Sequence, residues 1–190
     1  MQRTASQRLA DLLSGLCVLV LLCGLPLLPL APALAYFHFQ DPASIRFDQL
    51  MATFAYDTDD GLGNLLQIIL WEAWQSPDRA VLALFLLLTG VCGGIILVQG
   101  IRILSSVSDG TPFLPQNAVY LRRAARPCFL ITAGAAGRTL FTLCREGASA
   151  LLSYTALFVP VSIMFGLLFL VMSALFHRAA ELKVENDLTI

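Results

Sequence analysis

Four long runs of uncharged, mostly apolar residues divide this chain, and they limit its fold more than any other feature of the sequence. The runs cover 12–35, 80–101, 127–144 and 147–177, and one charge, Arg138, interrupts the third. A helix needs about 20 apolar residues to cross a hydrocarbon core of roughly 30 Å. In lipid only helices and closed barrels satisfy their own backbone groups. Because the runs are continuous rather than alternating, they predict helices.

We therefore expect an all-α integral membrane bundle of four transmembrane helices in a single domain, 1–190. Charged residues make up only 13% of the chain, about half the usual share in soluble domains. The net charge of −1 argues against direct nucleic-acid binding, which needs a clustered basic face. The expected spans are about 12–35, 80–101, 127–144 and 149–176, with an outer loop at 36–79, a cytoplasmic loop at 102–126 and a cytoplasmic tail at 177–190.

The first run has two readings. Arg3 and Arg8 followed by an apolar stretch and Ala33-Leu34-Ala35 fit a cleaved signal peptide. However, three prolines separate the apolar stretch from that site, and the distance is about twice that of an ordinary signal. We favour a retained span that the prolines Pro26, Pro29 and Pro32 end or kink.

The positive charges predict the orientation, because short cytoplasmic loops carry an excess of Lys and Arg. Eight basic residues flank the runs on one side and three on the other. Both termini and the loop 102–126 are therefore predicted to be cytoplasmic, and the acidic loop 36–79 to be outside. The eight are Arg3, Arg8, Arg102, Arg122, Arg123, Arg126, Arg178 and Lys183; the three are Arg46, Arg79 and Arg145, the last in a predicted tight turn at Arg145-Glu146.

The outer loop is predicted to contain short helices at 47–56 and 64–74. The second carries Trp71 and Trp74, and tryptophan favours the membrane–water boundary, so we expect this helix to lie along the outer leaflet. The acidic cluster 57–60 resembles the start of a calcium loop. An EF-hand would need glycine and glutamate where the chain has Leu62 and Ile68, which favours a solvated turn.

No pattern of residues indicates an enzyme, a cofactor or a metal site. The sequence contains no GxSxG, HExxH, P-loop or dinucleotide-binding motif. All five cysteines fall in predicted spans without a CxxC pair, and the two histidines, His38 and His177, are expected on opposite faces of the membrane. We therefore expect a protein that is not an enzyme.

Arg138 is the one charge within a predicted span. An arginine at mid-membrane costs at least about 2.5 kcal/mol on insertion scales and is a functional candidate by default. The acidic residues lie outside the predicted spans, so pairing with Glu72 or Glu146, bonding to carbonyls and snorkelling outward all stay open. A structural anchor and a ligand or signalling site are both consistent with this residue.

Two cytoplasmic segments are the most distinctive parts of the sequence. Asp109–Pro112 is a turn sequence, and Asn117 is a candidate cap for the helix that follows. In the tail, the apolar residues Leu182, Val184, Leu188 and Ile190 alternate, which suits a short strand or a docked peptide as well as a frayed end.

These segments resemble a family of uncharacterised bacterial four-helix membrane proteins, known only as a domain of unknown function. Its members share a G-x-P-F…N…L-R element, matched by Gly110, Pro112, Phe113, Asn117, Leu121 and Arg122. They share a tail like Glu185, Asn186, Asp187, Leu188, Thr189 and Ile190. The resemblance implies the bacterial cytoplasmic (inner) membrane and, as a partner, a small helix-turn-helix regulator. It makes the matched residues, except Leu121, candidates for partner docking.

Three functions therefore stay open. One is a membrane sensor or tether for such a regulator, bound through the loop and tail. Another is a small transporter or immunity-type protein, which would depend on Arg138 and Tyr154. The third is a structural membrane subunit, for which the glycines on span two offer a packing stripe, and a homo-oligomer fits this reading. The small residues are Gly90, Gly93, Gly94 and Gly100.

Overall fold

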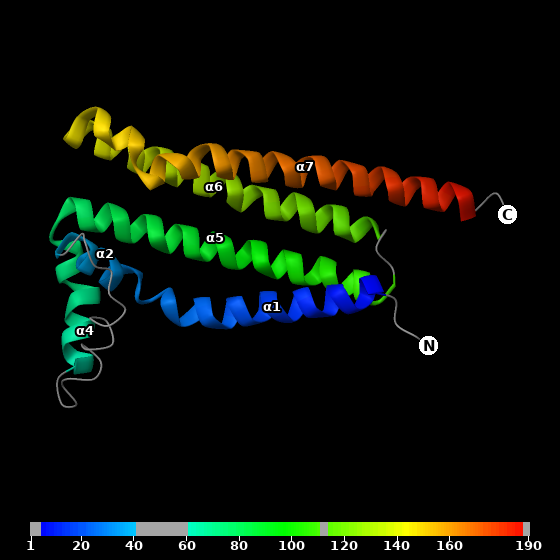
Figure 1. Ribbon diagram of the computed structural model, residues 1–190, viewed down its shortest axis with the longest axis horizontal. Coiled ribbons are helices and arrows are strands. Elements are labelled where there is room, and N and C mark those ends of the chain that lie inside the picture. Colours follow the sequence, from blue (N-terminus) through cyan, green and yellow to red (C-terminus); the bar gives the residue numbers. More distant parts are fainter. Residues whose placement is uncertain (1–4, 41–60, 111–113, 188–190) are drawn as a thin grey trace. The chain divides into compact units, whose positions relative to one another are not determined.

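The computed structural model describes residues 5–40, 61–110 and 114–187, and these form helices with no strand among them. In chain order the elements are α1 (Ala5–Leu27), α2 (Ala31–Gln40), α4 (Gly61–Leu70), the 3-10 helix η1 (Glu72–Trp74), α5 (Pro77–Ser108), α6 (Pro115–Glu146), the 3-10 helix η2 (Gly147–Leu152) and α7 (Tyr154–Asp187) (Figure 1). Four helices, α1, α5, α6 and α7, are long and apolar enough to cross a membrane. The predicted fold class is confirmed: the protein is an all-α, multi-pass membrane protein.

The chain divides into two compact units. Unit 1 comprises 1–24 and 91–190, and unit 2 comprises 25–90. Helix α5 begins in unit 2 and ends in unit 1. The single membrane domain expected from the sequence stays a prediction.

The proline series ends the first spanning helix, as predicted, but earlier than expected. Helix α1 ends at Leu27 rather than at residue 35, and a turn at 28–30 leads into α2. Proline lacks a backbone N–H and its ring clashes with the preceding helical turn, so Pro29 falls in the break. Pro32 is tolerated because it lies in the first turn of α2, where no donor is needed.

Unit 2 has a small core of Ala35 from α2 and Leu82, Ala83 and Leu86 from α5. Tight packing continues at Gly90, where an added Cβ would lie 2.7 Å from Cδ1 of Leu28. The helix predicted over 64–74 is present as α4 and η1. The helix predicted at 47–56 and the acidic cluster at 57–60 lie outside the described residues.

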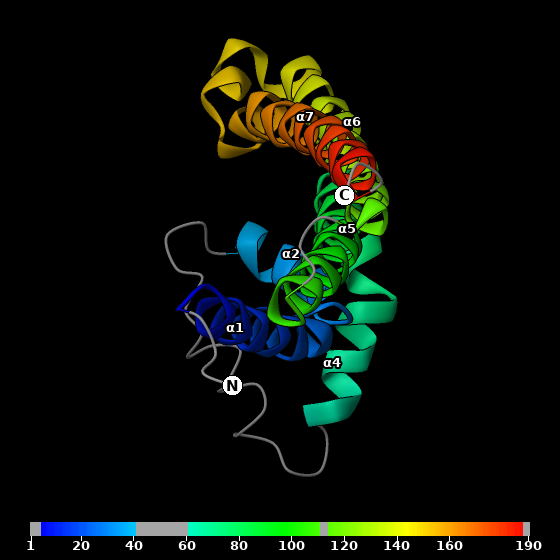
Figure 2. The ribbon, with the colours of Figure 1, turned by 90° about the vertical axis from the view of Figure 1, so that its right-hand side faces the viewer.

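In unit 1, α6 and α7 run antiparallel and pack along each other (Figure 2). The buried side chains of α6 follow a helical period and include Leu121, Cys128 and Ile131. On α7, Gly166 lets the ring of Phe129 approach, since an added Cβ would lie 3.1 Å from it. Small residues thus allow the two helices to come close together.

The connection between α6 and α7 differs from two expectations. The tight turn expected at Arg145-Glu146 is wrong: α6 runs through both residues, and Gly147, with φ +75°, ends it. Helix α7 begins at Tyr154 rather than at 149, because η2 intervenes and the Ser153 hydroxyl accepts a bond from the Ala156 N–H at 3.4 Å.

The inner bounds also differ, since α6 begins at Pro115 rather than at 127 and α5 extends to Ser108 rather than 101. Of the alternating tail residues, Leu182 and Val184 lie in helix α7, which continues to Asp187, and not in a strand. Leu188 and Ile190 lie outside the described residues.

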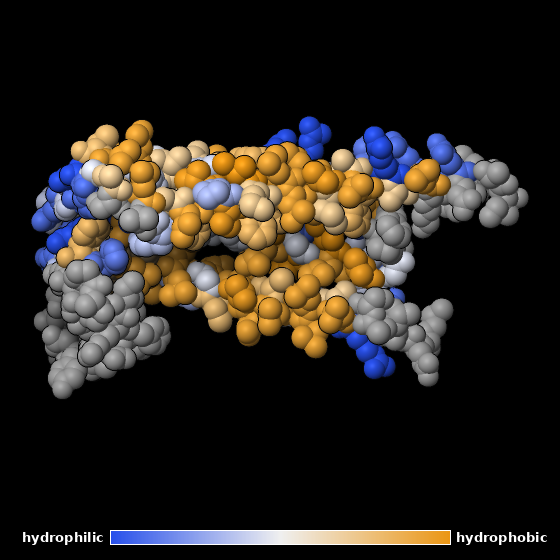
Figure 3. Space-filling view, turned by 45° about the horizontal axis from the view of Figure 1, so that its top comes forward, coloured by the Kyte–Doolittle hydropathy of each residue, from blue (hydrophilic) through white to orange (hydrophobic). Residues whose placement is uncertain are grey.

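The long helices expose apolar side chains on a scale that is rare in soluble proteins. On α7, Leu157 is 67% and Met164 71% exposed, and Figure 3 shows hydrophobic residues over most of this helix. Such surface contacts the acyl chains of a bilayer.

Candidate functional site at the basic end of unit 1

One end of unit 1 gathers the start of α1, the end of α5, the start of α6 and the end of α7, as both ribbon views show (Figures 1 and 2). We call it the basic end. Most of the chain's arginines lie on these helix ends. The motif residues Asn117, Leu121 and Arg122 lie at the start of α6, and Gly110 follows the end of α5. The arginines are Arg8, Arg102, Arg122, Arg123, Arg126 and Arg178.

Polar side chains hold the last turn of α5 from two sides. The Ser108 hydroxyl donates to a carboxylate oxygen of Asp11 on α1. On the other side, the Asn117 amide of α6 donates to Ser106 Oγ at 2.6 Å. Asp11 lies inside a helix that is long and apolar enough to span, whereas the sequence had placed every acidic residue outside the spans. Helix α1 begins at Ala5, before the predicted start at 12, which explains this difference.

The structure separates the loop motif into internal and surface residues. Gly110 has φ +76°, a conformation that favours glycine, and an added Cβ would lie 3.4 Å from Nε2 of Gln7. Asn117 is fully buried and Leu121 is 7% exposed. These three residues therefore organise the end of the helices. Pro112 and Phe113 lie outside the described residues.

The capping role expected for Asn117 is wrong. Leu114 is the N-cap residue of α6, and Pro115 occupies the first turn. Proline is favoured there because its fixed φ suits a helix and its missing N–H is not needed. Asn117 lies further into the helix, where its side chain bonds to α5 instead.

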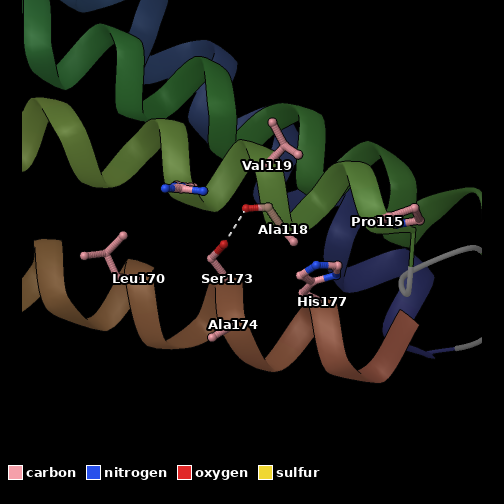
Figure 4. A pocket seen from close by; sticks show the side chains of 8 residues that line it. Pro115, Ala118, Val119, Leu170, Ser173, Ala174 and His177 are labelled. Carbon is pink, nitrogen blue, oxygen red and sulfur yellow. Dashed lines mark hydrogen bonds between the residues drawn. The ribbon is translucent and has the colours of Figure 1, made fainter. Parts of the chain in front are cut away.

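A groove of about 530 Å³ lies between the start of α6 and the end of α7 (Figure 4). Its lining residues are Pro115, Ala118, Val119 and Arg122 from α6, with Leu170, Ser173, Ala174 and His177 from α7. In Figure 4, Ser173 and His177 reach from α7 toward α6. The Ser173 hydroxyl donates to the Ala118 carbonyl at 2.7 Å and holds the helices together at this point.

Two cationic or protonatable side chains stand among the apolar walls of the groove. Arg122 comes from the predicted motif, and His177 comes from α7. Nε2 of His177 lies 3.8 Å from Oε1 of Glu181, one turn further along. A guanidinium beside apolar surface can bind a carboxylate by paired hydrogen bonds. The groove can therefore accept an apolar segment that carries an acidic group.

None of the described tail residues lines this groove. Glu185 is exposed, and Asn186 and Asp187 form the end of α7. Leu188, Thr189 and Ile190 lie outside the described residues. Sequence reasoning missed Ser173 as a groove residue and noted His177 only as the end of a span. The signal was present, since Leu170, Ser173, Ala174 and His177 recur at helical spacing.

Arg138 forms a second polar cluster toward the other end of the α6–α7 hairpin. Its guanidinium donates to Thr155 Oγ1 at 2.8 Å and to the Tyr154 hydroxyl at 3.2 Å, and it lies 5.3 Å from the centre of the Tyr154 ring. It stands eight residues before the end of α6 at Glu146, or about 12 Å along the helix. The hydroxyls that open α7 are partners that the sequence reasoning did not name for it.

Among the residues that the structure describes, no three His, Cys, Asp or Glu side chains come together as a metal ion would require. The five cysteines are free thiols.

Residues 64–190, about two thirds of the chain, match a protein family whose description is "Protein of unknown function (DUF2975)". This region contains α5, α6 and α7 with the groove and the Arg138 cluster. No curated protein and no solved structure matches the chain. This match identifies the chain, with its four helices that are long and apolar enough to cross a membrane, as a member of the DUF2975 family.

Proposed function

We propose that this protein is a membrane tether of the bacterial inner membrane, which binds a small helix-turn-helix regulator at the basic end of unit 1. The observation that carries the proposal is the groove between α6 and α7. Its walls combine apolar side chains with Arg122 and His177, and this combination suits the binding of a protein segment. The proposal assigns no catalysis to the chain.

Charge supports a cytoplasmic position for the basic end. Arginines lie on the helix ends around the groove, and few lie on the opposite ends of the same helices. Excess positive charge stays on the cytoplasmic side during insertion. A groove on that side would be accessible to a soluble regulator.

The chemistry of the groove supports a partner with an apolar anchor and an acidic side chain. Val119 is 47% and Leu170 37% exposed, so apolar surface is available for burial. Arg122 supplies a planar donor that fits a carboxylate. The class of the regulator comes from the resemblance of the loop and tail motifs, which is an argument by analogy.

The test places a photo-crosslinking amino acid at Ala174, inside the groove, in the full chain in its native membrane. The expected product joins this position to a soluble DNA-binding protein of helix-turn-helix type. With Arg122→Ala the yield should fall by at least about tenfold, because one charge-assisted hydrogen bond contributes about 1.5–3 kcal/mol.

Arg123→Ala is the matched control. Arg123 is the next residue, is exposed like Arg122 and carries the same charge, but it does not line the groove. An equal loss of cross-linking yield with both variants would show that only the overall positive charge matters and not the groove. Cross-links to lipid alone would contradict the proposal. Removing 181–190 tests the tail separately, since an unchanged yield would exclude it from docking.

One observation favours a small transporter as the second candidate. Arg138, Tyr154 and Thr155 form a polar cluster within helices that can span the membrane. Charged residues in such positions often line substrate paths. If the protein is a transporter, Arg138→Leu should abolish transport of its substrate, while the protein still inserts into the membrane.

A further inference from the structure

Helix α4 and η1 form a short segment that runs across the direction of α5 within unit 2. Both ribbon views show α4 crossing the line of the spanning helix (Figures 1 and 2). A helix that crosses a spanning helix in this way lies near the plane of the membrane. Whether it enters the lipid depends on its side chains and on its depth.

The described side chains of this segment are mostly apolar, although Gln67 is exposed and Glu72 is half-buried. Leu66 is 54%, Leu70 70% and Trp71 66% exposed. No charged residue occurs from Gly61 to Trp71. Leu66 and Leu70 are four residues apart, so they lie on one face of the helix. In water this face would be an unusual exposure of large hydrophobic side chains.

The depth of the segment follows from what comes next in the chain. η1 ends at Trp74 and α5 begins at Pro77, so the segment lies at the level where a spanning helix starts. Asp78 follows directly, and the Arg79 guanidinium lies 4.8 Å from the centre of the Tyr36 ring. Charged and tyrosine side chains of this kind mark the boundary between lipid and water.

We propose that α4 and η1 lie in the interface of one membrane leaflet, with Leu66, Leu70 and Trp71 inserted among the acyl chains. Lipid is the occupant because the exposed apolar face is continuous along the chain with the lipid-facing α5, where Leu84 is 55% exposed. The segment has no Lys or Arg, so its insertion does not need anionic headgroups.

Trp74 has a different role from Trp71. Its indole N–H donates to the Ile69 carbonyl at 2.9 Å, which satisfies one of the open carbonyls at the end of α4. This bond folds Trp74 back over the helix end, whereas the Trp71 ring is more exposed. The two are the only tryptophans of the chain, so intrinsic fluorescence reports on this segment alone.

The test reconstitutes the full chain, with Trp74→Phe so that only Trp71 emits, in phosphatidylcholine vesicles. Some of the lipids carry bromine either near the headgroup or near the end of the acyl chain. Shallow bromine should quench Trp71 at least about twice as strongly as deep bromine, because interfacial helices insert only about 5–10 Å. Adding anionic lipid should leave the quenching unchanged.

The substitution Leu70→Gln should reduce this quenching about twofold, because it weakens insertion of the apolar face. Gln75→Asn, at an exposed polar residue beyond η1, is the control and should change nothing. Quenching of Trp71 by aqueous iodide, without an effect of brominated lipid, would overturn the proposal. Protection from both quenchers would also overturn it, because it would show that protein covers this face.

Discussion

The side-chain amide of Asn117 on α6 donates a hydrogen bond of 2.6 Å to the hydroxyl of Ser106 on α5. The Ser106 hydroxyl in turn donates to the Ile103 carbonyl at 2.8 Å. Asn117 is fully buried, so its amide depends on partners inside the protein. This bond therefore fixes the start of α6, which carries one wall of the groove.

Ser106→Ala should destabilise the protein by about 1–3 kcal/mol, because it removes the acceptor of a buried amide. Combining it with Asn117→Ala should cost less than the two single changes added together, since both remove the same bond. Unfolding in mixed detergent, followed by circular dichroism, measures these differences. Ser105→Ala at the exposed neighbour is the control; additive effects of Ser106 and Asn117 would exclude the coupling.

Gly110→Ala should cost about 1–2 kcal/mol, because a residue with a Cβ resists the left-handed backbone at φ +76°. Gly147→Ala is the matched comparison, since Gly147 has φ +75° and no neighbour within 4 Å of an added Cβ. Both variants should lose similar stability in the same unfolding assay.

The two glycine variants should differ in docking. Gly110 lies at the basic end, so Gly110→Ala should lower the cross-linking yield from Ala174 as well. Gly147 lies at the opposite end of α6, so Gly147→Ala should leave the cross-linking yield unchanged. The reverse pattern would show that the turn at Gly110 has no part in the groove.

The sequence was sufficient to predict the spanning helices because lipid imposes a single strong requirement on backbone groups. It also located the proline break after α1 and the helix before α5. The bounds were less predictable, since apolar runs mark the hydrocarbon core and not the helices, which extend beyond it. Helix α6 shows this: its polar first turns, with Arg122, continue the same helix outside the apolar run.

The candidate site could be predicted only in part. The motif drew attention to Asn117 and Arg122, yet one is buried and the other lines the groove. A sequence motif does not separate these roles, because both depend on which face of α6 meets α5 and α7. Similarly, Thr155 is a partner of Arg138 only because η2 sets where α7 begins.

Thr155→Val should destabilise the α6–α7 hairpin by about 1.5–3 kcal/mol, because it removes a hydrogen bond from the charged Arg138 at a site only 2% exposed. Tyr154→Phe should cost less than about 1 kcal/mol. Tyr154 is 50% exposed, so headgroups or water can replace its hydroxyl, and its ring still contacts the guanidinium.

The unfolding assay with detergent measures both variants, and Thr142→Val is the control. Thr142 is a half-buried threonine near Arg138, but its hydroxyl donates to the Arg138 backbone carbonyl rather than accepting from the side chain. A larger loss for Tyr154→Phe than for Thr155→Val would show that the tyrosine is the main partner of Arg138.

The orientation inferred from the arginines can be tested with one natural cysteine. Cys144 is exposed and lies two residues before the end of α6, away from the basic end. In a variant with the other four cysteines changed to alanine, a membrane-impermeant maleimide should label Cys144 on intact spheroplasts. Arg178→Cys, in a background without natural cysteines, should react only after the membrane is permeabilised. Labelling of position 178 alone on intact spheroplasts would reverse the topology, and the groove between α6 and α7 would then face away from any cytoplasmic regulator.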